Sequence, residues 1–263
     1  MVIGRREHEQ KGAVQPDASP WAQVEVAQRD VGLPCLLIPQ PAHAVLAGEL
    51  AAALLTTPFG PLPSEIKRAI QMHDTGWAAS DAQQIQRLRG PHAANAAPVS
   101  FIAISPEEAT EAWTASIDAV EAFSKAGAII VSRHFSLLAQ QAHHQRFLQA
   151  ERSRQRRLEG VMKKNGDPPK GADLDLWTSA LGFCDLVSLY LVSGLSREVE
   201  FPLAHPASPK AHTAPRVTMR SEGQQLHFFP PIAPGGCTLT IQELNHPLSP
   251  QGPRAETLTW EVL

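Results

Sequence analysis

The stretch Ala69-Ile-Gln-Met-His-Asp-Thr-Gly-Trp77 ends an apolar helical segment with two polar residues that can bind a metal ion. His73 and Asp74 are followed at once by Thr75 and Gly76, which predict a turn. Because neighbouring residues of a regular helix point about 100° apart, both side chains can face one ion only where the helix ends and the backbone turns. The stretch therefore predicts a site at the end of a helix.

Helical patterns extend around this stretch through most of residues 41–196. Apolar residues recur there at helical spacing. The sequence Ser105-Pro-Glu-Glu108 predicts a sharp helix start, because it combines an N-cap serine, a proline in the first turn and the glutamate of a capping box. We therefore expect residues 41–196 to form a helical core that carries the site.

The two ends of the chain have a different character. Residues 1–20 are polar and predict a loose leader. Residues 21–40 alternate apolar and polar side chains and predict a β-hairpin, whereas residues 197–263 combine a proline-rich connection with further strand patterns. We expect one domain over residues 1–263: a mainly α fold with a helical-bundle core and a small antiparallel β-sheet built from the N- and C-terminal segments (α+β).

Composition narrows the classes of function. Hydrophobic residues are 43% and charged residues 19% of the chain, as in ordinary globular proteins, and the net charge of −3 disfavours nucleic acid as the main partner. The three cysteines are far apart, which favours reduced thiols and a cytoplasmic protein. No run of 18 apolar residues and no signal-like segment occurs, so we expect no membrane partner.

Common catalytic motifs are absent from the sequence. It contains no Gly-x-Gly-x-x-Gly, no phosphate-binding Gly-x-x-x-x-Gly-Lys-Ser/Thr, no Gly-x-Ser-x-Gly and no His-Glu-x-x-His. These absences disfavour the usual nucleotide-binding folds and serine or zinc hydrolases. A site built from His73 and Asp74 must therefore take its other ligands from elsewhere in the chain.

Two residues on other predicted helices are candidate ligands, His43 near the start of the core and Asp185 near its end. Nitrogen and oxygen ligands that converge from separate elements are what a divalent ion requires. A lone histidine such as His43 is more often a surface or capping residue. Asp185 is the stronger candidate for a ligand. It is flanked by the apolar stretches 183–184 and 186–187, and an acid in such surroundings is costly to bury without a positive partner. Either a metal ion or Arg133 could be that partner.

Three more residues could contribute to the site. His134 lies in an apolar helix, where a core histidine and a ligand for a second metal or for the substrate explain it equally well. His92, in a predicted loop beside a proline, could reach a substrate, although most loop histidines have no such role. Trp77 could line a pocket, and packing explains it as readily.

The ordered set His43, His73-Asp74 and Asp185 resembles the His-Asp (HD) superfamily of metal-dependent phosphohydrolases, in which an H…HD…D tetrad binds a divalent metal. More narrowly, several blocks resemble a bacterial family of unknown function within that fold, and the resemblance covers roughly residues 30–230. These blocks are Ile38-Pro-Gln-Pro-Ala-His43, His73-Asp-Thr-Gly-Trp77, Val131-Ser-Arg-His-Phe135, Asp185-Leu-Val-Ser-Leu189 and Phe228-Phe-Pro230.

The resemblance implies an HD-type helical core in which His43, His73, Asp74 and Asp185 bind a divalent metal ion. The ligand types do not distinguish Mn, Fe, Ni, Co, Mg and Zn. His134 lies where related members place further histidines for a second metal, but no second matching histidine is found, which argues against a binuclear site.

These residues predict metal-assisted hydrolysis of a phosphate ester or nucleotide, with Asp74 orienting the nucleophile. The partner would be a small phosphorylated molecule, whose phosphate His134, Arg133 or His92 could contact. Two alternatives stay open: a non-catalytic module that binds a metal or a phosphoryl ligand, and a di-iron oxygenase on the same scaffold, which needs two irons. The sequence also leaves a homo-oligomer open.

Overall fold

The computed structural model describes residues 1–4, 18–29, 34–89, 97–139, 142–166, 169–248 and 255–263. Its α-helices are α1 (Pro20–Arg29), α2 (Gln40–Ala53), α3 (Ser64–Gln71), α4 (Ala78–Arg87), α5 (Pro106–Glu121), α6 (Lys125–Leu138), α7 (Gln145–Lys164) and α8 (Gly171–Val192). Its strands are β1 (Val2–Gly4), β2 (Cys35–Ile38), β3 (Val199–Pro202), β4 (Arg216–Glu222), β5 (Gln225–Phe229), β6 (Cys237–His246) and β7 (Ala255–Val262). The 3₁₀ helices are η2 (Thr75–Trp77), η4 (Phe101–Ala103) and η5 (Pro209–His212).

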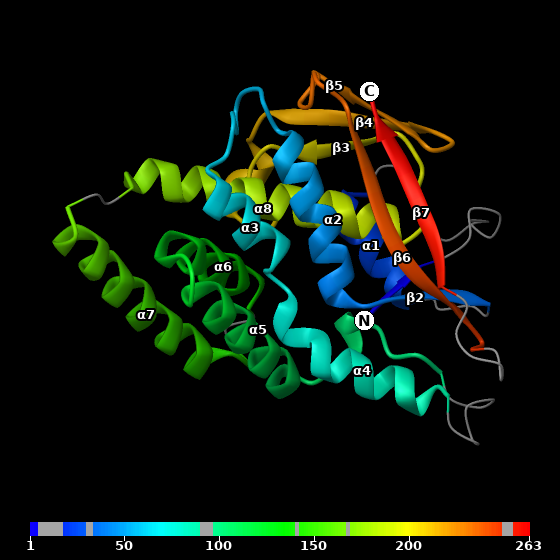
Figure 1. Ribbon diagram of the computed structural model, residues 1–263, viewed down its shortest axis with the longest axis horizontal. Helices are drawn as coiled ribbons and strands as arrows, with labels where there is room; N and C mark the ends of the chain where they lie inside the picture. The colour runs from blue at the N-terminus through cyan, green and yellow to red at the C-terminus, as the bar shows by residue number, and fades with distance from the viewer. Residues whose placement is uncertain (5–17, 30–33, 90–96, 140–141, 167–168, 249–254) are drawn as a thin grey trace.

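The strands form one seven-stranded sheet in the order β1-β2-β6-β7-β5-β4-β3. Its neighbours are antiparallel except β5 and β7, which are parallel. The N-terminal strand β2 pairs with the C-terminal strand β6, with Leu36 opposite Asn245. The sheet curls into a half-barrel beside the helices, as the orange and red strands of Figure 1 show.

The expected mainly α fold, a helical bundle with a small antiparallel sheet, is therefore wrong. Helices make up 54% and strands 18% of the described residues, and the sheet is mixed, so the protein is a mixed α/β fold. The sequence hid the extent of the sheet because β1 and β3 have only three and four residues, too few to show alternation. The parallel pairing of β5 with β7 is a tertiary contact that no local pattern encodes.

The β-hairpin expected for residues 21–40 is also wrong, because its first half forms helix α1. The hydroxyl of Ser19 accepts a hydrogen bond from the backbone N–H of Ala22 at 3.2 Å, and a proline follows it in the first turn. This is a helix start. Val24 is buried but Val26 is 37% exposed, so the two valines that suggested a strand point to different sides of a helix.

The leader expected over residues 1–20 is partly described. Residues 2–4 form strand β1, which pairs with β2 and is buried, so this part of the prediction is wrong. Residues 5–17 lie outside the described residues. Residues 2–4 join the sheet through backbone pairing with residues 36–38 of β2, and the apolar side chains of Val2 and Ile3 are buried there.

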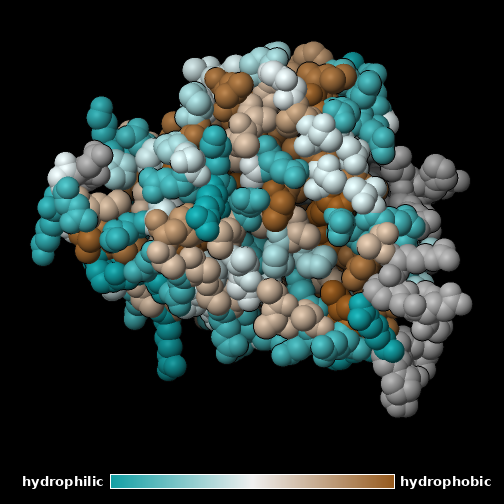
Figure 2. All heavy atoms as spheres, viewed as in Figure 1, coloured by the Kyte–Doolittle hydropathy of each residue, from teal (hydrophilic) through white to brown (hydrophobic). Residues whose placement is uncertain are grey.

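The helical region expected over residues 41–196 holds helices α2 to α8. The predicted capping box is confirmed: the Ser105 hydroxyl accepts from the Glu108 N–H at 3.2 Å, and the Glu108 carboxylate accepts from the Ser105 N–H at 3.3 Å. Helix α7 lies on the outer side, where hydrophilic side chains predominate (Figure 2), and its Arg154 pairs with Glu121 of α5 at 2.9 Å.

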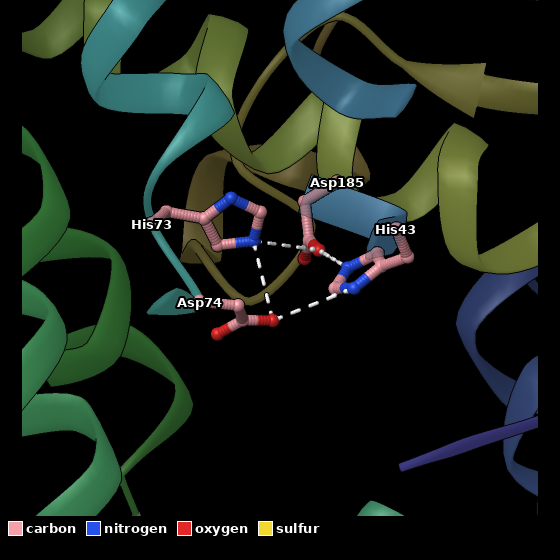
Figure 3. A group of neighbouring side chains, drawn as sticks. All are labelled: His43, His73, Asp74 and Asp185. Atoms are coloured by element: carbon pink, nitrogen blue, oxygen red, sulfur yellow. Dashed lines mark hydrogen bonds and ion pairs between the residues drawn. The ribbon is translucent and has the colours of Figure 1, made fainter. Parts of the chain in front are cut away.

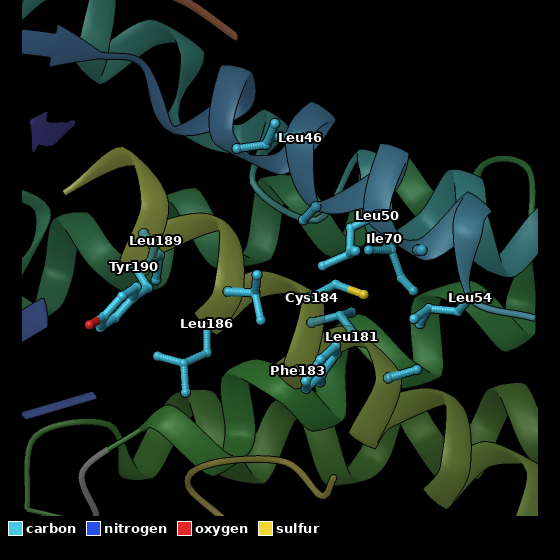
Figure 4. Close-up of a cluster of buried hydrophobic side chains, with 14 of the residues drawn as sticks. Leu46, Leu50, Leu54, Ile70, Leu181, Phe183, Cys184, Leu186, Leu189 and Tyr190 are labelled. Atoms are coloured by element: carbon cyan, nitrogen blue, oxygen red, sulfur yellow. The ribbon is translucent and has the colours of Figure 1, made fainter. Parts of the chain in front are cut away.

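Helix α8 is the centre of the core and contacts α1, α2, α3 and α6. Figure 4 shows its apolar side chains, including Leu181 and Cys184, against Leu50 of α2 and Ile70 of α3. Among the described helices, only α8 could cross a membrane by length and composition, but 78% of that stretch is buried inside the protein. A helix apolar on all sides is expected in a core. Helix α2 also packs on β6, and helix α8 contacts β1 and β3. Both helices therefore contact the sheet as well as the other helices.

Candidate metal centre

Four side chains from three parts of the fold converge in the interior. His43 comes from α2, His73 and Asp74 from the segment between α3 and η2, and Asp185 from α8 (Figure 3). One ligand atom of each lies within 4.8 Å of the others, and all four residues are buried. The structure thus brings together the four residues that the sequence suggested as ligands. We refer to them as the tetrad.

The distances within the tetrad are those of atoms around one ion. Asp185 Oδ1 lies 2.9 Å from His43 Nε2 and 3.2 Å from His73 Nε2. Asp74 Oδ2 lies 3.6 Å from His73 Nε2. Nitrogen and oxygen ligands of a tetrahedral or octahedral ion lie about 2.8–3.6 Å apart when each bond is about 2.0–2.2 Å. The tetrad therefore fits a metal ion, and a buried His/Asp cluster that could bind a metal is present.

Each histidine is held by its other ring nitrogen. His43 Nδ1 donates to the carbonyl of Gln40 at 2.8 Å, and His73 Nδ1 donates to the carbonyl of Ile70 at 2.7 Å. A carbonyl can only accept, so each Nδ1 carries a proton, and both Nε2 atoms face the carboxylates. Metal-binding histidines are commonly fixed in this way.

The tetrad holds positive charge between its carboxylates. Burial lowers the pKa of His73, but Asp74 and Asp185 outweigh it and raise the pKa from 6.5 to about 9. Burial also favours the neutral form of Asp185, yet hydrogen bonds from His43 and His73 hold its pKa well below the usual range. Without a metal, the raised pKa of His73 lets this ring keep a proton, which supplies positive charge beside the carboxylates. A divalent ion would compete with that proton for the same place.

The turn that presents His73 and Asp74 has two backbone features. Met72 (φ −109°, ψ 5°) and Asp74 (φ −112°, ψ 19°) leave helical geometry for the bridge region, which lets both neighbouring side chains face one centre. The tertiary position of the turn depends on Gly76. A Cβ there would lie 2.0 Å from the carbonyl oxygen of Ala112 in α5. Gly76 is thus needed for a close approach to α5, not for the backbone freedom that the sequence suggested.

Trp77 fixes the orientation of Asp74. Its indole Nε1 donates to Asp74 Oδ1 at 3.1 Å, which turns Oδ2 toward His73. Burial raises the pKa of Asp74, although His73 and His43 lower it in part. The 3%-exposed Trp77 also lines a cavity, as the sequence suggested for it.

That cavity has a volume of about 250 Å³ and reaches His43, Asp74 and Asp185. Aromatic rings form much of its wall: Trp21, Trp77, Phe101, Trp113 and Phe135. Trp113 and Phe135 stack with their ring centroids 5.3 Å apart and their planes at 15°. A concave, largely aromatic cavity with a few polar groups at one end is typical of a small-molecule site.

The remaining suggested residues take different places. His134 lines the cavity, and its Nε2 lies 3.8 Å from Asp185 Oδ2. Arg133 is neither the partner of Asp185 nor part of the described cavity wall, because it faces outward and pairs with Asp175 at 2.9 Å and Glu159 at 3.2 Å. His92 lies outside the described residues.

The sequence did not suggest His205, which is 2% exposed and touches His134. His205 Nε2 lies 2.9 Å from His134 Nδ1. Burial lowers the pKa of His205 to about 4 and that of His134 well below 6.5, in both cases against an opposing effect of Asp185, so both rings are neutral. His205 lies in the proline-rich connection, where no periodicity marks it as buried.

A family model described as a protein of unknown function (DUF3891) matches residues 28–242, a range that includes the tetrad, His134 and His205. No curated protein and no solved structure matches the chain.

Proposed function

We propose that this chain, which belongs to the DUF3891 family, is a metal-dependent hydrolase that acts on a phosphate ester or nucleotide. The observation that carries the proposal is the convergence of His43 Nε2 and His73 Nε2 on one buried oxygen of Asp185. Such a cluster is unfavourable without positive charge in its middle. It also lies at the end of a cavity large enough for a small substrate.

The donor set fits a divalent ion. Two imidazole nitrogens and two carboxylates suit Mn, Fe, Co, Ni, Zn or Mg, so His43, His73, Asp74 and Asp185 would hold the metal. A bound ion would polarise a phosphoryl oxygen and lower the pKa of a bound water. The order of these ligands along the chain resembles that of the His-Asp phosphohydrolases.

We assign to Asp74 the role of orienting the nucleophile, which is a water molecule. Trp77 holds its Oδ1, which leaves Oδ2 on the side of the histidines. Asp74 would therefore orient the attacking water.

The cavity wall supports an ester that carries a planar ring, such as a nucleobase. Its aromatic rings include those of Trp21, Trp77 and Phe101, and a planar ring of a substrate could pack against such rings. Among the described residues of the wall, Arg29 is the one permanent cation, and its side chain is 72% exposed and pairs with Glu25. A wall with so little positive charge suits a single phosphate group better than a polyphosphate chain.

The test is hydrolysis by the purified chain of a panel of phosphomonoesters, phosphodiesters and nucleotides, each with Mn²⁺, Co²⁺, Ni²⁺, Zn²⁺ and Mg²⁺. Release of phosphate or of a nucleoside, abolished by chelation and by Asp74→Asn, is the expected result. Asp175→Asn is the matched control, because Asp175 is an exposed acid that pairs with Arg133. Metal and nucleotide binding without turnover would overturn the hydrolase and favour the non-catalytic binding module. Iron-dependent consumption of oxygen would favour the oxygenase.

A further inference from the structure

Behind the tetrad, two buried histidines and one backbone amide form a continuous chain of contacts. The N–H of Ala207 donates to His205 Nδ1 at 3.2 Å. His205 Nε2 and His134 Nδ1 lie 2.9 Å apart. His134 Nε2 then faces Asp185 Oδ2 at 3.8 Å and borders the cavity. This series of contacts therefore runs from the proline-rich connection to the tetrad.

The direction of every hydrogen bond in this chain is fixed by its first member. A backbone N–H can only donate, so His205 Nδ1 must accept and carries no proton. A neutral imidazole with a bare Nδ1 has its proton on Nε2, so His205 donates to His134 Nδ1. By the same step, the proton of neutral His134 sits on Nε2. The opposite direction would place two N–H groups against each other at Ala207.

We infer that His205 is a positioning residue, which holds His134 as an Nε2–H donor directed at the cavity, so that His134 contacts a substrate oxygen and is not a ligand of a second metal ion. A ligand nitrogen must offer a lone pair, and here Nε2 carries the proton. The distance of 3.8 Å to Asp185 is too long for a hydrogen bond, which leaves this N–H available to an oxygen atom in the cavity. The inference holds whether or not the reaction is hydrolysis.

Helix α8 is shaped to admit His205. Gly182 lies one turn before Asp185, and a Cβ at Gly182 would be 2.5 Å from Cδ2 and 2.9 Å from Cγ of the His205 ring. A glycine inside a helix costs about 1 kcal/mol relative to alanine. The space that the His205 ring needs explains why a glycine stands at position 182 of the core helix. With a larger side chain there, the ring could not lie where it contacts His134.

The direct test is ¹⁵N NMR of the histidine rings in the metal-free protein, with the His134 signals assigned by their loss in His134→Gln. The expected result is a protonated Nε2 and an unprotonated Nδ1 for both His134 and His205. A proton on His134 Nδ1 would overturn the inference. Because no metal or substrate is present, this result is independent of the proposed hydrolase activity.

Variants of His205 test its positioning role. His205→Ala should release the tautomer of His134, whereas His205→Gln, whose amide N–H can replace the imidazole donor, should retain it. Where an ester of the panel is turned over, His205→Ala should lower kcat about 10–100-fold, the usual effect of losing an orienting partner, with little change in KM. An unchanged tautomer and an unchanged kcat in folded His205→Ala would overturn the positioning role.

Calorimetric titration with Mn²⁺ separates a donor from a ligand. Wild type and His134→Gln should each bind one ion per chain with affinities within about threefold. A second Mn²⁺ ion that is lost in His134→Gln, or a fall in affinity of the order of 100-fold, would show His134 to be a ligand and overturn the inference.

Discussion

His43 Nε2 lies 2.9 Å from Asp185 Oδ1, although the two residues are 142 positions apart in the chain. The contact joins α2, which packs on β6, to α8, which contacts β1 and β3. His73 adds a second imidazole on the same oxygen at 3.2 Å. Two rings that share one buried carboxylate oxygen are stable there only with positive charge among them, from a proton or a metal ion. The proposed metal binding and the stability of the core therefore depend on the same atoms.

Asp185→Ala should abolish metal binding in the micromolar range. The substitution removes the oxygen to which both Nε2 atoms point, and the loss should exceed about 100-fold, since loss of an outer-shell partner alone costs about 10–100-fold. Asp175→Asn, in an exposed position of the same helix, should bind like wild type. Calorimetric titration with Mn²⁺ and Co²⁺ measures both. Equal affinity of Asp185→Ala and wild type would exclude the tetrad as the binding site.

The metal-free protein should lose stability as the pH rises from 6.5 to above 9. The folded-state pKa of His73 is about 9, above its ordinary value of 6.5, because Asp74 and Asp185 outweigh the effect of burial. The stabilisation is therefore complete below pH 6.5 and disappears as pH passes the folded pKa, with a maximum of about 3 kcal/mol. Urea unfolding in the presence of a chelator, at several pH values, measures it.

His73→Gln is the control for this pH dependence, because glutamine does not titrate. The difference in free energy of unfolding between wild type and His73→Gln should shrink as the pH rises from 6.5 to above 9. A difference that stays constant over this interval would mean that His73 does not carry the charge of the metal-free site.

Gly182→Ala should destabilise the protein and disturb His134. The new methyl group would meet the His205 ring at 2.5 Å, and such overpacking costs about 1–3 kcal/mol, more than the gain of about 1 kcal/mol from replacing a helical glycine. Gly160→Ala in α7 is the matched control, because nothing lies within 4 Å of its Cβ position, and it should be neutral or stabilising. Thermal unfolding compares the two. A Gly182→Ala protein as stable as Gly160→Ala would show that His205 does not need this space.

Ser116→Ala should loosen the turn that carries His73 and Asp74. The buried Ser116 hydroxyl accepts the Gly76 N–H at 2.9 Å, and leaving that donor without a partner costs about 1–3 kcal/mol. Ser153→Ala, on the exposed side of α7, should cost little. We expect weaker Mn²⁺ binding by Ser116→Ala as well as lower stability. Unchanged affinity in a destabilised Ser116→Ala protein would separate the anchoring of the turn from the metal site.

The sequence was informative where a local signal coincides with a local structure. The Ser105 capping box and the end of α3 before His73 both have such signals. It failed for α1, where Val24 and Val26 suggested alternation and the stronger signal, a serine followed by a proline, starts a helix instead. The sequence analysis expected a small antiparallel sheet from the two ends of the chain, but it missed the seven strands and the parallel pair of β5 and β7, because β1 and β3 are too short to show alternation and no local pattern encodes that pair.

For the site, residue types made the four residues candidates, and the resemblance of their order to the His-Asp phosphohydrolases joined them into the tetrad. Reasoning from residue type also placed Arg133 near Asp185, but adjacent residues on α6 point to different sides, and only His134 faces inward. His205 could not be suggested, since its burial depends on the space left by Gly182. Contacts that depend on the absence of a side chain leave little trace in local patterns.

The most direct measurement is an anomalous difference map from a crystal of the full chain grown with Mn²⁺. The account predicts one strong peak per chain, at bonding distance from Nε2 of His43 and His73 and from carboxylate oxygens of Asp74 and Asp185, with no second peak bonded to His134. An empty tetrad at saturating Mn²⁺, with its histidines and aspartates in direct contact as before, would contradict the central claim that these four residues form a metal centre.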